Sequence, residues 1–358
     1  MSENKNINYG VCRYKNIGST CYMNSILHIL QQLPYFIEYI YNKKFEDNDN
    51  NLENSNKMLI YELYKLFKIS LDNDNSIITP LGFKKFIGIK NEIWNDNNQQ
   101  DSHDFLNFLL QTLKEEIQSN NEIIYGKNKI KYFVNNNISN ITIINNIVAS
   151  ISEMRHKLNE YSCLSIIFDG IFETARKCAY CNSISKKYEN YSTLCLTIPN
   201  KYDNITIYDC LDELTSEEIL SFDNMVNCNL CGLKTRAINK LLLWKTPKIL
   251  IIQIKRFKYN NQNNTSEKIT SNVEYPIHNL DLNKYFNNSS PYKNKNKYNL
   301  IGINIHLGDC RNGHYISIIK NKLNNKWYLY NDEHPIKEIN CEKDLQVSNA
   351  YLLFYICI

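Results

Sequence analysis

The sequence predicts an α+β protein in which helices come first and strands follow. Apolar residues recur at helical spacing in four segments before residue 119, most clearly over 102–118. From about residue 164 onward, short alternating or β-branched runs separated by turn residues replace that pattern. Helices and strands are therefore segregated along the chain, which is typical of α+β folds and not of alternating β-α units.

The first helix is expected over residues 22–33, where one face is apolar and Pro34 ends the pattern. Thr20 is suited to the N-cap position, which places Cys21 on the first turn. The other expected elements are helices over 57–71, 80–88 and 102–118 and strands over 191–198, 248–257, 298–306, 314–319 and 327–330.

The composition indicates one large folded domain or two smaller ones, because 43% of the 358 residues are hydrophobic. The net charge is only +4 and both signs are interspersed, so we expect no nucleic acid partner. The polar N-terminus lacks a signal-peptide core, and no apolar run reaches membrane-spanning length. We therefore expect an intracellular protein without a membrane partner, whose 12 cysteines are reduced thiols used for metal binding and chemistry.

Cys21 follows a glycine turn and opens a predicted helix. Backbone N–H groups and the helix dipole at such a position stabilise a thiolate, which attacks carbonyl groups when a histidine lies nearby. An ordinary small buried cysteine fits the same position, and the helix alone does not separate the two interpretations.

A cysteine protease also needs a histidine and a third polar group that orients it. Gly313 lets a loop approach closely before a strand that begins at His314, and the next strand ends at Asn331 and Asp332. A hairpin joining these strands would bring either Asn331 or Asp332 level with His314. His306 lies earlier in the same region, and we interpret it as structural or as shaping the groove.

Two Cys-x-x-Cys units, Cys178 with Cys181 and Cys228 with Cys231, have the spacing with which paired thiolates share a tetrahedral zinc ion. One such pair alone would also fit a redox motif or chance. Two pairs favour one structural zinc ion per chain with four cysteine ligands.

Three segments resemble motifs of the ubiquitin-specific protease family. Residues 16–25, Asn-Ile-Gly-Ser-Thr-Cys-Tyr-Met-Asn-Ser, resemble its cysteine box, with Ser19 in place of the usual Asn. Residues 313–332 resemble its histidine box, in which Gly-His-Tyr precedes Trp-x-x-x-(Asn/Asp)-Asp. Residues 99–105 resemble its Gln-Gln-Asp-x-x-Glu-Phe element, with Asp104 in place of Glu. The resemblance runs from about Tyr9 to the C-terminus.

The resemblance implies a role for each matching residue. Cys21 is the expected nucleophile and His314 its base. Asn331 is expected to orient His314, with Asp332 as the alternative, and Asn16 to donate to the oxyanion. The residues expected to contact the C-terminal tail of ubiquitin are Gln100, Asp101, Asp104, Gly313 and Tyr315.

The same resemblance implies a papain-like catalytic domain over 9–358 that follows a short polar lead over 1–8. We expect a helical thumb over about 9–160 and a β-rich palm with zinc-binding β fingers over about 161–358. The implied reaction is hydrolysis of the bond after the terminal glycine of ubiquitin. The implied partners are ubiquitin and ubiquitinated proteins, together with an activating protein, because small members of the family often need one. An inactive ubiquitin-binding scaffold and a protease for another ubiquitin-like modifier are the alternatives.

Overall fold

The computed structural model describes residues 12–42, 58–73, 76–117, 149, 163–200, 204–260, 265–294 and 297–358. The predicted polar lead over 1–8 lies outside the described residues. The chain forms two compact units. The first comprises Met1–Ile117, Gln253–Asn272 and Leu300–Tyr355, and the second comprises Gln118–Ile252, Val273–Asn299 and Ile356–Ile358.

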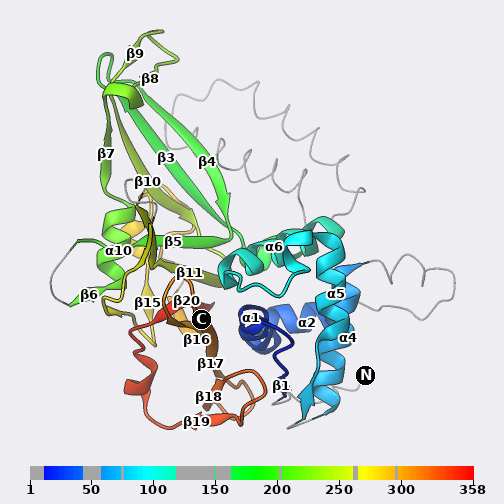
Figure 1. Ribbon diagram of the computed structural model, residues 1–358. Helices are drawn as coiled ribbons and strands as arrows, with labels where there is room; N and C mark the ends of the chain where they lie inside the picture. The colour runs from blue at the N-terminus through cyan, green and yellow to red at the C-terminus, as the bar shows by residue number, and fades with distance from the viewer. Residues whose placement is uncertain are drawn as a thin grey trace, which may run out of the picture. The chain divides into compact units, whose positions relative to one another are not determined.

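One helix of the first unit is buried along its whole length. That helix is α1 (Cys21–Gln32), all of whose residues are buried, and it packs against α6 (Ser102–Ile117). Pro34 ends α1, as predicted, and also begins a further helix, because proline fits the first helical position. The other helices of this unit are α2 (Pro34–Asn42), α4 (Leu59–Asp72), α5 (Leu81–Lys90) and the short η1 (Glu92–Trp94) and η5 (Glu342–Leu345) (Figure 1).

The C-terminal part of the first unit is a sheet whose neighbouring strands follow the order β19, β18, β17, β16 and β20, with β11 next to β20. Their bounds are β11 (Ile249–Lys255), β16 (Lys297–Gly308), β17 (Gly313–Lys320), β18 (Trp327–Tyr330), β19 (Lys337–Ile339) and β20 (Ala350–Cys357). Helix α1 packs against β17. Two small pairs complete the unit, β1 (Arg13–Tyr14) with β2 (Ile77–Ile78) and β12 (Phe257–Asn260) with β13 (Thr265–Lys268).

The second unit is built on a four-stranded sheet in the order β4, β3, β10 and β7. These strands are β3 (Gly170–Cys178), β4 (Ile184–Tyr191), β7 (Glu217–Leu220) and β10 (Ala237–Lys245), and all their pairings are antiparallel. A small hairpin of β8 (Val226–Asn227) and β9 (Lys234–Thr235) stands at one end of β3 and β7 (Figure 1). The remaining elements are α9 (Cys163–Phe168), β5 (Thr193–Thr197), β6 (Ile205–Thr206), α10 (Ile207–Leu214), η3 (Phe222–Asn224), β14 (Val273–Glu274), β15 (Leu280–Asp281) and η4 (Asn283–Tyr285).

No helix among the described residues has the length and apolar character that a membrane crossing requires.

Candidate active site

Cys21 is the first residue of α1 and only 4% of its surface is exposed. The turn before it passes through the left-handed region at Gly18 (φ 104°) and Ser19 (φ 51°). A side chain at Gly18 would also crowd the loop opposite, because its Cβ would lie 2.9 Å from Asn97 Oδ1. Thr20 occupies the N-cap position, but its side chain makes no cap hydrogen bond.

The side chain of Asn16 locks this turn. Its Oδ1 accepts from the backbone N–H of Thr20 at 3.0 Å and from that of Gly18 at 3.3 Å. Its Nδ2 donates to Asp332 Oδ2 at 2.8 Å. The amide group therefore cannot rotate freely, and its N–H groups keep a fixed direction beside the start of α1.

His314 lies near the start of β17, opposite Leu307 of β16. Its Nε2 lies 2.7 Å from Asn331 Oδ1, just beyond the end of β18. Hydrogen bonding with the side chain of Cys21 is the largest of the effects that raise the pKa of His314 to about 9, and burial opposes it. Asn331 and the charge of Asp332 raise this pKa further. The imidazole is therefore hydrogen-bonded to the amide of Asn331, and its interaction with the side chain of Cys21 favours the protonated ring.

Asp332 lies further from the imidazole than Asn331 does. Its Oδ2 is 4.0 Å from His314 Nε2, and its two carboxylate oxygens accept instead from the side-chain amides of Asn16 and Asn24, each at 2.8 Å. Asp332 is 6% exposed, and burial raises the pKa of its carboxyl while the two amide donors oppose that shift. Asp332 thus contacts the turn before Cys21, whereas Asn331 contacts the imidazole.

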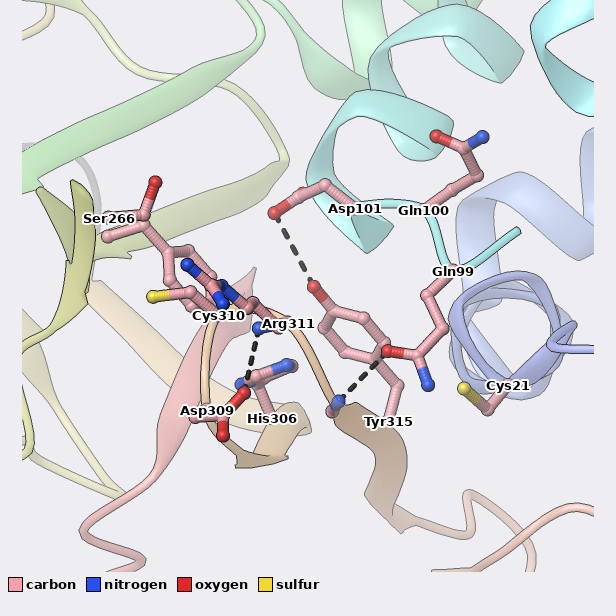
Figure 2. Close-up of a pocket in the computed structure, with 12 residues that line it drawn as sticks. Cys21, Gln99, Gln100, Asp101, Ser266, His306, Asp309, Cys310, Arg311 and Tyr315 are labelled. Atoms are coloured by element: carbon pink, nitrogen blue, oxygen red, sulfur yellow. Dashed lines mark hydrogen bonds between the residues drawn. The ribbon is translucent and has the colours of Figure 1, made fainter. Parts of the chain in front are cut away.

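A groove with a cavity volume of about 310 Å³ begins at Cys21. Figure 2 shows Cys21 at one end of it and Ser266 and Cys310 at the other. Four of the residues predicted to contact substrate are among those that line it, and Asp104 is not. The lining residues are Cys21, Gln99, Gln100, Asp101, Phe257, Ser266, His306, Asp309, Cys310, Arg311, Gly313 and Tyr315.

The carboxylate of Asp101 makes two sets of hydrogen bonds, one that caps α6 and one with tyrosine hydroxyls. One carboxylate oxygen caps α6 by accepting from the backbone N–H groups of His103 at 2.6 Å and Asp104 at 3.2 Å. The other accepts from the hydroxyls of Tyr351 at 2.7 Å and Tyr315 at 3.4 Å (Figure 2). The second oxygen therefore holds Tyr351 and also Tyr315, which lines the groove.

His306 packs directly on Gly313. A Cβ added at Gly313 would lie 2.0 Å from His306 Nε2, so only glycine fits this strand start. The imidazole of His306 also contacts the rings of Phe257 and Tyr315, with centroids 5.0 and 4.7 Å away. Burial, assisted by the charge of Lys268, lowers the pKa of His306 to about 4. His306 is therefore neutral at pH 7 and forms a wall of the groove.

Gln99 is a site residue for which the sequence predicted no role. Its Oε1 accepts from the backbone N–H of Gly313 at 2.9 Å, directly beside His314 (Figure 2). The signal was present, because Gln99 belongs to the same motif as Gln100 and Asp101, but the spacing of that motif does not show which glutamine turns toward the histidine strand.

The four cysteines predicted to bind zinc lie together in the second unit, at the turns of the β3–β4 and β8–β9 hairpins. The Sγ atoms of Cys178 and Cys231 are 4.0 Å apart, and those of Cys181 and Cys228 are 3.6 Å apart. All four Sγ atoms lie within 4.8 Å of one another. Four thiolates around a tetrahedral zinc ion at 2.3 Å would be roughly 3.8 Å apart, so this group fits zinc.

The segregated α+β fold, with a helix-start cysteine next to a histidine on a strand, is that of papain-like cysteine hydrolases. The chain matches the family model described as ubiquitin carboxyl-terminal hydrolase over residues 12–355 and belongs to that family. The predicted fold class and family are both confirmed.

Relatives extend over nearly all of this chain but are often longer. Ubiquitin carboxyl-terminal hydrolase Usp2 of Drosophila melanogaster is 26% identical over 97% of this chain and 35% of its own length. Human ubiquitin carboxyl-terminal hydrolase 2 is 28% identical over 97% of this chain and 55% of its own. The chain therefore spans about one third to one half of the length of these relatives.

Solved structures share the fold over the whole chain. A chain of the SAGA DUB module of Ubp8, Sgf11, Sus1 and Sgf73 bound to monoubiquitin gives a TM-score of 0.73 at 25% identity, covering 100% of this chain and 71% of that one. The same module bound to ubiquitin aldehyde gives a TM-score of 0.72, also at 25% identity, and 72% of that chain is covered.

Proposed function

We propose that this chain is a deubiquitinating cysteine protease that hydrolyses the isopeptide or peptide bond after the C-terminal glycine of ubiquitin. The observation that carries the proposal is the position of His314, whose imidazole contacts both Cys21 and Asn331. Membership of the ubiquitin carboxyl-terminal hydrolase family and similarity to a module bound to ubiquitin support the choice of substrate.

In the proposed mechanism, the Cys21 thiolate attacks the carbonyl carbon of the terminal glycine. Protonated His314 donates its proton to the departing amine, and a thioester to Cys21 remains. Neutral His314 then takes a proton from water, which attacks the thioester and releases the ubiquitin carboxylate and the thiol. Asn331 holds the imidazole in the orientation that serves both steps.

Asn16 is the proposed oxyanion donor. One of its two amide hydrogens goes to Asp332, and the other is free to bind the negative charge that develops on the carbonyl oxygen. A donor held in place before the reaction is effective because it does not have to reorganise as the charge forms. Asp332 is then a positioning residue that acts on the reaction through Asn16.

The groove that begins at Cys21 is the proposed site of the ubiquitin tail. Gln100, Gly313 and Tyr315 would line the path of the extended tail. Asp101 would shape the path by holding Tyr315, and exposed Asp104 at the start of α6 would attract the basic residues of the tail.

We also propose one structural zinc ion, held by the four cysteine thiolates of the second unit. Such an ion would tie the turns of two hairpins together and supply no group to peptide cleavage. The helical thumb over about 9–160 and the palm and fingers over about 161–358 remain our proposal for the domain organisation, with the four cysteines in the fingers.

The proposed partners are ubiquitin and ubiquitinated proteins inside the cell, together with an activating protein. The solved relatives occur in a module that also contains Sgf11, Sus1 and Sgf73, which supports the last of these.

A ubiquitin probe with a C-terminal vinyl electrophile tests the proposal. We expect covalent labelling of Cys21 in the wild-type chain, and none in Cys21→Ser, which should still bind ubiquitin and lose all turnover of a ubiquitin–fluorophore substrate. Wild-type turnover by Cys21→Ser would refute the mechanism. Binding of the probe without labelling would indicate a scaffold, and labelling only by probes of another ubiquitin-like modifier would change the substrate.

A further inference from the structure

A buried lysine contacts the residue that follows the nucleophile. Lys84 belongs to α5 and only 7% of its surface is exposed. Its Nζ donates to the backbone carbonyl of Trp94 at 2.5 Å, to that of Asp96 at 3.0 Å and to the hydroxyl of Tyr22 at 3.2 Å. An ammonium group has three N–H donors, so each of them has an oxygen partner here.

These contacts connect two parts of the site that the sequence keeps far apart. Tyr22 follows Cys21 directly, and its ring packs against those of Trp94 and Phe105, with centroids 5.7 and 5.5 Å away. Trp94 is the last residue of η1, and the chain then runs through residues 95–101 to the start of α6. We call residues 95–101 the groove loop, because three of them line the groove.

The groove loop makes further contacts with its surroundings and within itself. Gly18, in the turn before Cys21, faces Asn97 closely enough that a Cβ would lie 2.9 Å from Asn97 Oδ1. Within the loop, Asp96 accepts from the backbone N–H of Asn98 at 3.2 Å and from Gln100 Nε2 at 3.4 Å. These contacts shape the loop itself, whereas the ammonium of Lys84 fixes the start of the loop to α5 and to Tyr22.

The last residues of the groove loop contact β17, the strand that carries His314. Gln99 accepts from the backbone N–H of Gly313 at 2.9 Å, next to His314. Asp101 holds the hydroxyl of Tyr315, which follows His314. A displacement of the groove loop would therefore move the groove wall relative to Cys21 without removing any reacting group.

We propose that Lys84 is a positioning residue, which fixes the groove loop to the start of the nucleophile helix and so sets the geometry of the substrate groove. A lysine suits this position because it can point three donors at three oxygens, two of them backbone carbonyls. The inference rests on the proposed function for the identity of the substrate, but not for the contacts themselves.

The test compares Lys84→Met with Lys85→Met, a neighbour on the same helix whose side chain is exposed. We expect Lys84→Met to raise KM for a ubiquitin–fluorophore substrate roughly tenfold or more, since small misplacement of binding groups has large effects. Alkylation of Cys21 by iodoacetamide, which needs no groove, should stay within about twofold of wild type. The Lys85→Met variant should match wild type in both measurements.

A double-mutant cycle separates positioning from general destabilisation. If Lys84 acts through the groove loop, Gln99→Ala and Lys84→Met should combine less than additively in kcat/KM. Additive effects, or equal losses in turnover and in alkylation, would overturn the proposal. Should Lys84→Met fail to fold, Tyr22→Phe removes one of the three acceptors while keeping the ring, and a smaller rise in KM is expected; an unchanged KM in that variant would contradict the proposal.

Hydrogen exchange gives a measurement that does not depend on ubiquitin. Backbone amides of residues 95–101 should exchange faster in Lys84→Met than in wild type and in Lys85→Met. Unchanged exchange in this segment would refute the inference even if the chain proves to be a deubiquitinase. A wild-type chain inert toward ubiquitin would refute the proposed function and leave the exchange result valid.

Discussion

The contact between His314 and Asn331 allows a prediction with both a size and a pH signature. Asn331→Ala removes an acceptor that lies 2.7 Å from the imidazole Nε2. A hydrogen bond to a charged group contributes about 1.5–3 kcal/mol. At about 1.4 kcal/mol for each tenfold change in rate, kcat/KM should fall roughly ten- to a hundredfold. Activity should not vanish, because His314 keeps its contact with Cys21.

The pH signature follows from the sign of the pKa shift. Hydrogen bonding with Cys21 is the largest cause that raises the pKa of His314 to about 9, and the bond to Asn331 raises it further. Because the first step of the proposed mechanism needs protonated His314, we expect activity to be present below this pKa and to be lost as the pH rises through it. Asn331→Ala removes one of the contributions that raise the pKa of His314. The alkaline limb of the pH–activity profile should therefore move below pH 9. Measuring kcat/KM on a ubiquitin–fluorophore substrate from about pH 6 to pH 10 reads this limb directly.

Asp332→Ala is the matched control, since Asp332 is the next residue but lies 4.0 Å from the imidazole. We expect it to lower kcat, because Asn16 and Asn24 lose their acceptors, and to move the alkaline limb less than Asn331→Ala does. The assignment of the orienting residue would be wrong if Asn331→Ala left the limb at its wild-type position. Asp332 would instead be the orienting residue if Asp332→Ala showed the larger shift of the alkaline limb.

Two further predictions concern the groove and the metal. Gly313→Ala should lower stability by about 1–3 kcal/mol and raise KM, because the added methyl group overlaps the neighbouring imidazole, whereas Gly82→Ala, which faces open space on α5, should leave KM unchanged. Thermal unfolding and steady-state kinetics on both variants test this prediction. Equal stability and equal KM in the two variants would show that the groove wall accommodates the added methyl group. Elemental analysis should find one zinc ion per chain and none in the double variant Cys178→Ser/Cys228→Ser; an unchanged zinc content would exclude these ligands.

Helical periodicity located the helices of the first unit closely. The helix expected over 22–33 is observed as Cys21–Gln32, and the one expected over 102–118 as Ser102–Ile117. Helix α2 was not predicted, although Pro34 was correctly placed at the end of α1. A proline stops one helix and suits the first turn of another, and the residues after it are too few for a decisive periodicity.

The motifs pointed to residues that the structure brings together, but they did not show how each of them is connected. In a regular strand Asn331 and Asp332 would point to opposite sides, because neighbouring side chains alternate between faces. Asp332 instead has a φ of 46°, so the chain has left strand geometry, and both side chains lie near His314. Local pattern could not show this, because the conformation depends on the amides of Asn16 and Asn24, some 300 residues earlier.

Long-range contacts also explain why the role of Asp101 could be predicted only in part. Its helix cap is a local contact and can be inferred from the residues that follow it. Its bond to Tyr351 joins positions 250 residues apart, and neither composition nor periodicity indicates such a contact. The four cysteines lie in two pairs that are distant in the sequence. Their grouping could still be predicted, because the chemistry of thiolate ligands indicates which of them belong together.

The complete burial of α1 limits which parts of such a chain can tolerate amino-acid substitutions. Every side chain of this helix is enclosed, so almost any substitution there disturbs packing on some side. The backbone amide hydrogens of α1 should be among the slowest in the unit to exchange with solvent. Cys21 is therefore the first residue of a rigid helix. Changes in substrate preference should accumulate instead in the groove loop and in residues 309–312, where exposed side chains can vary without repacking the interior.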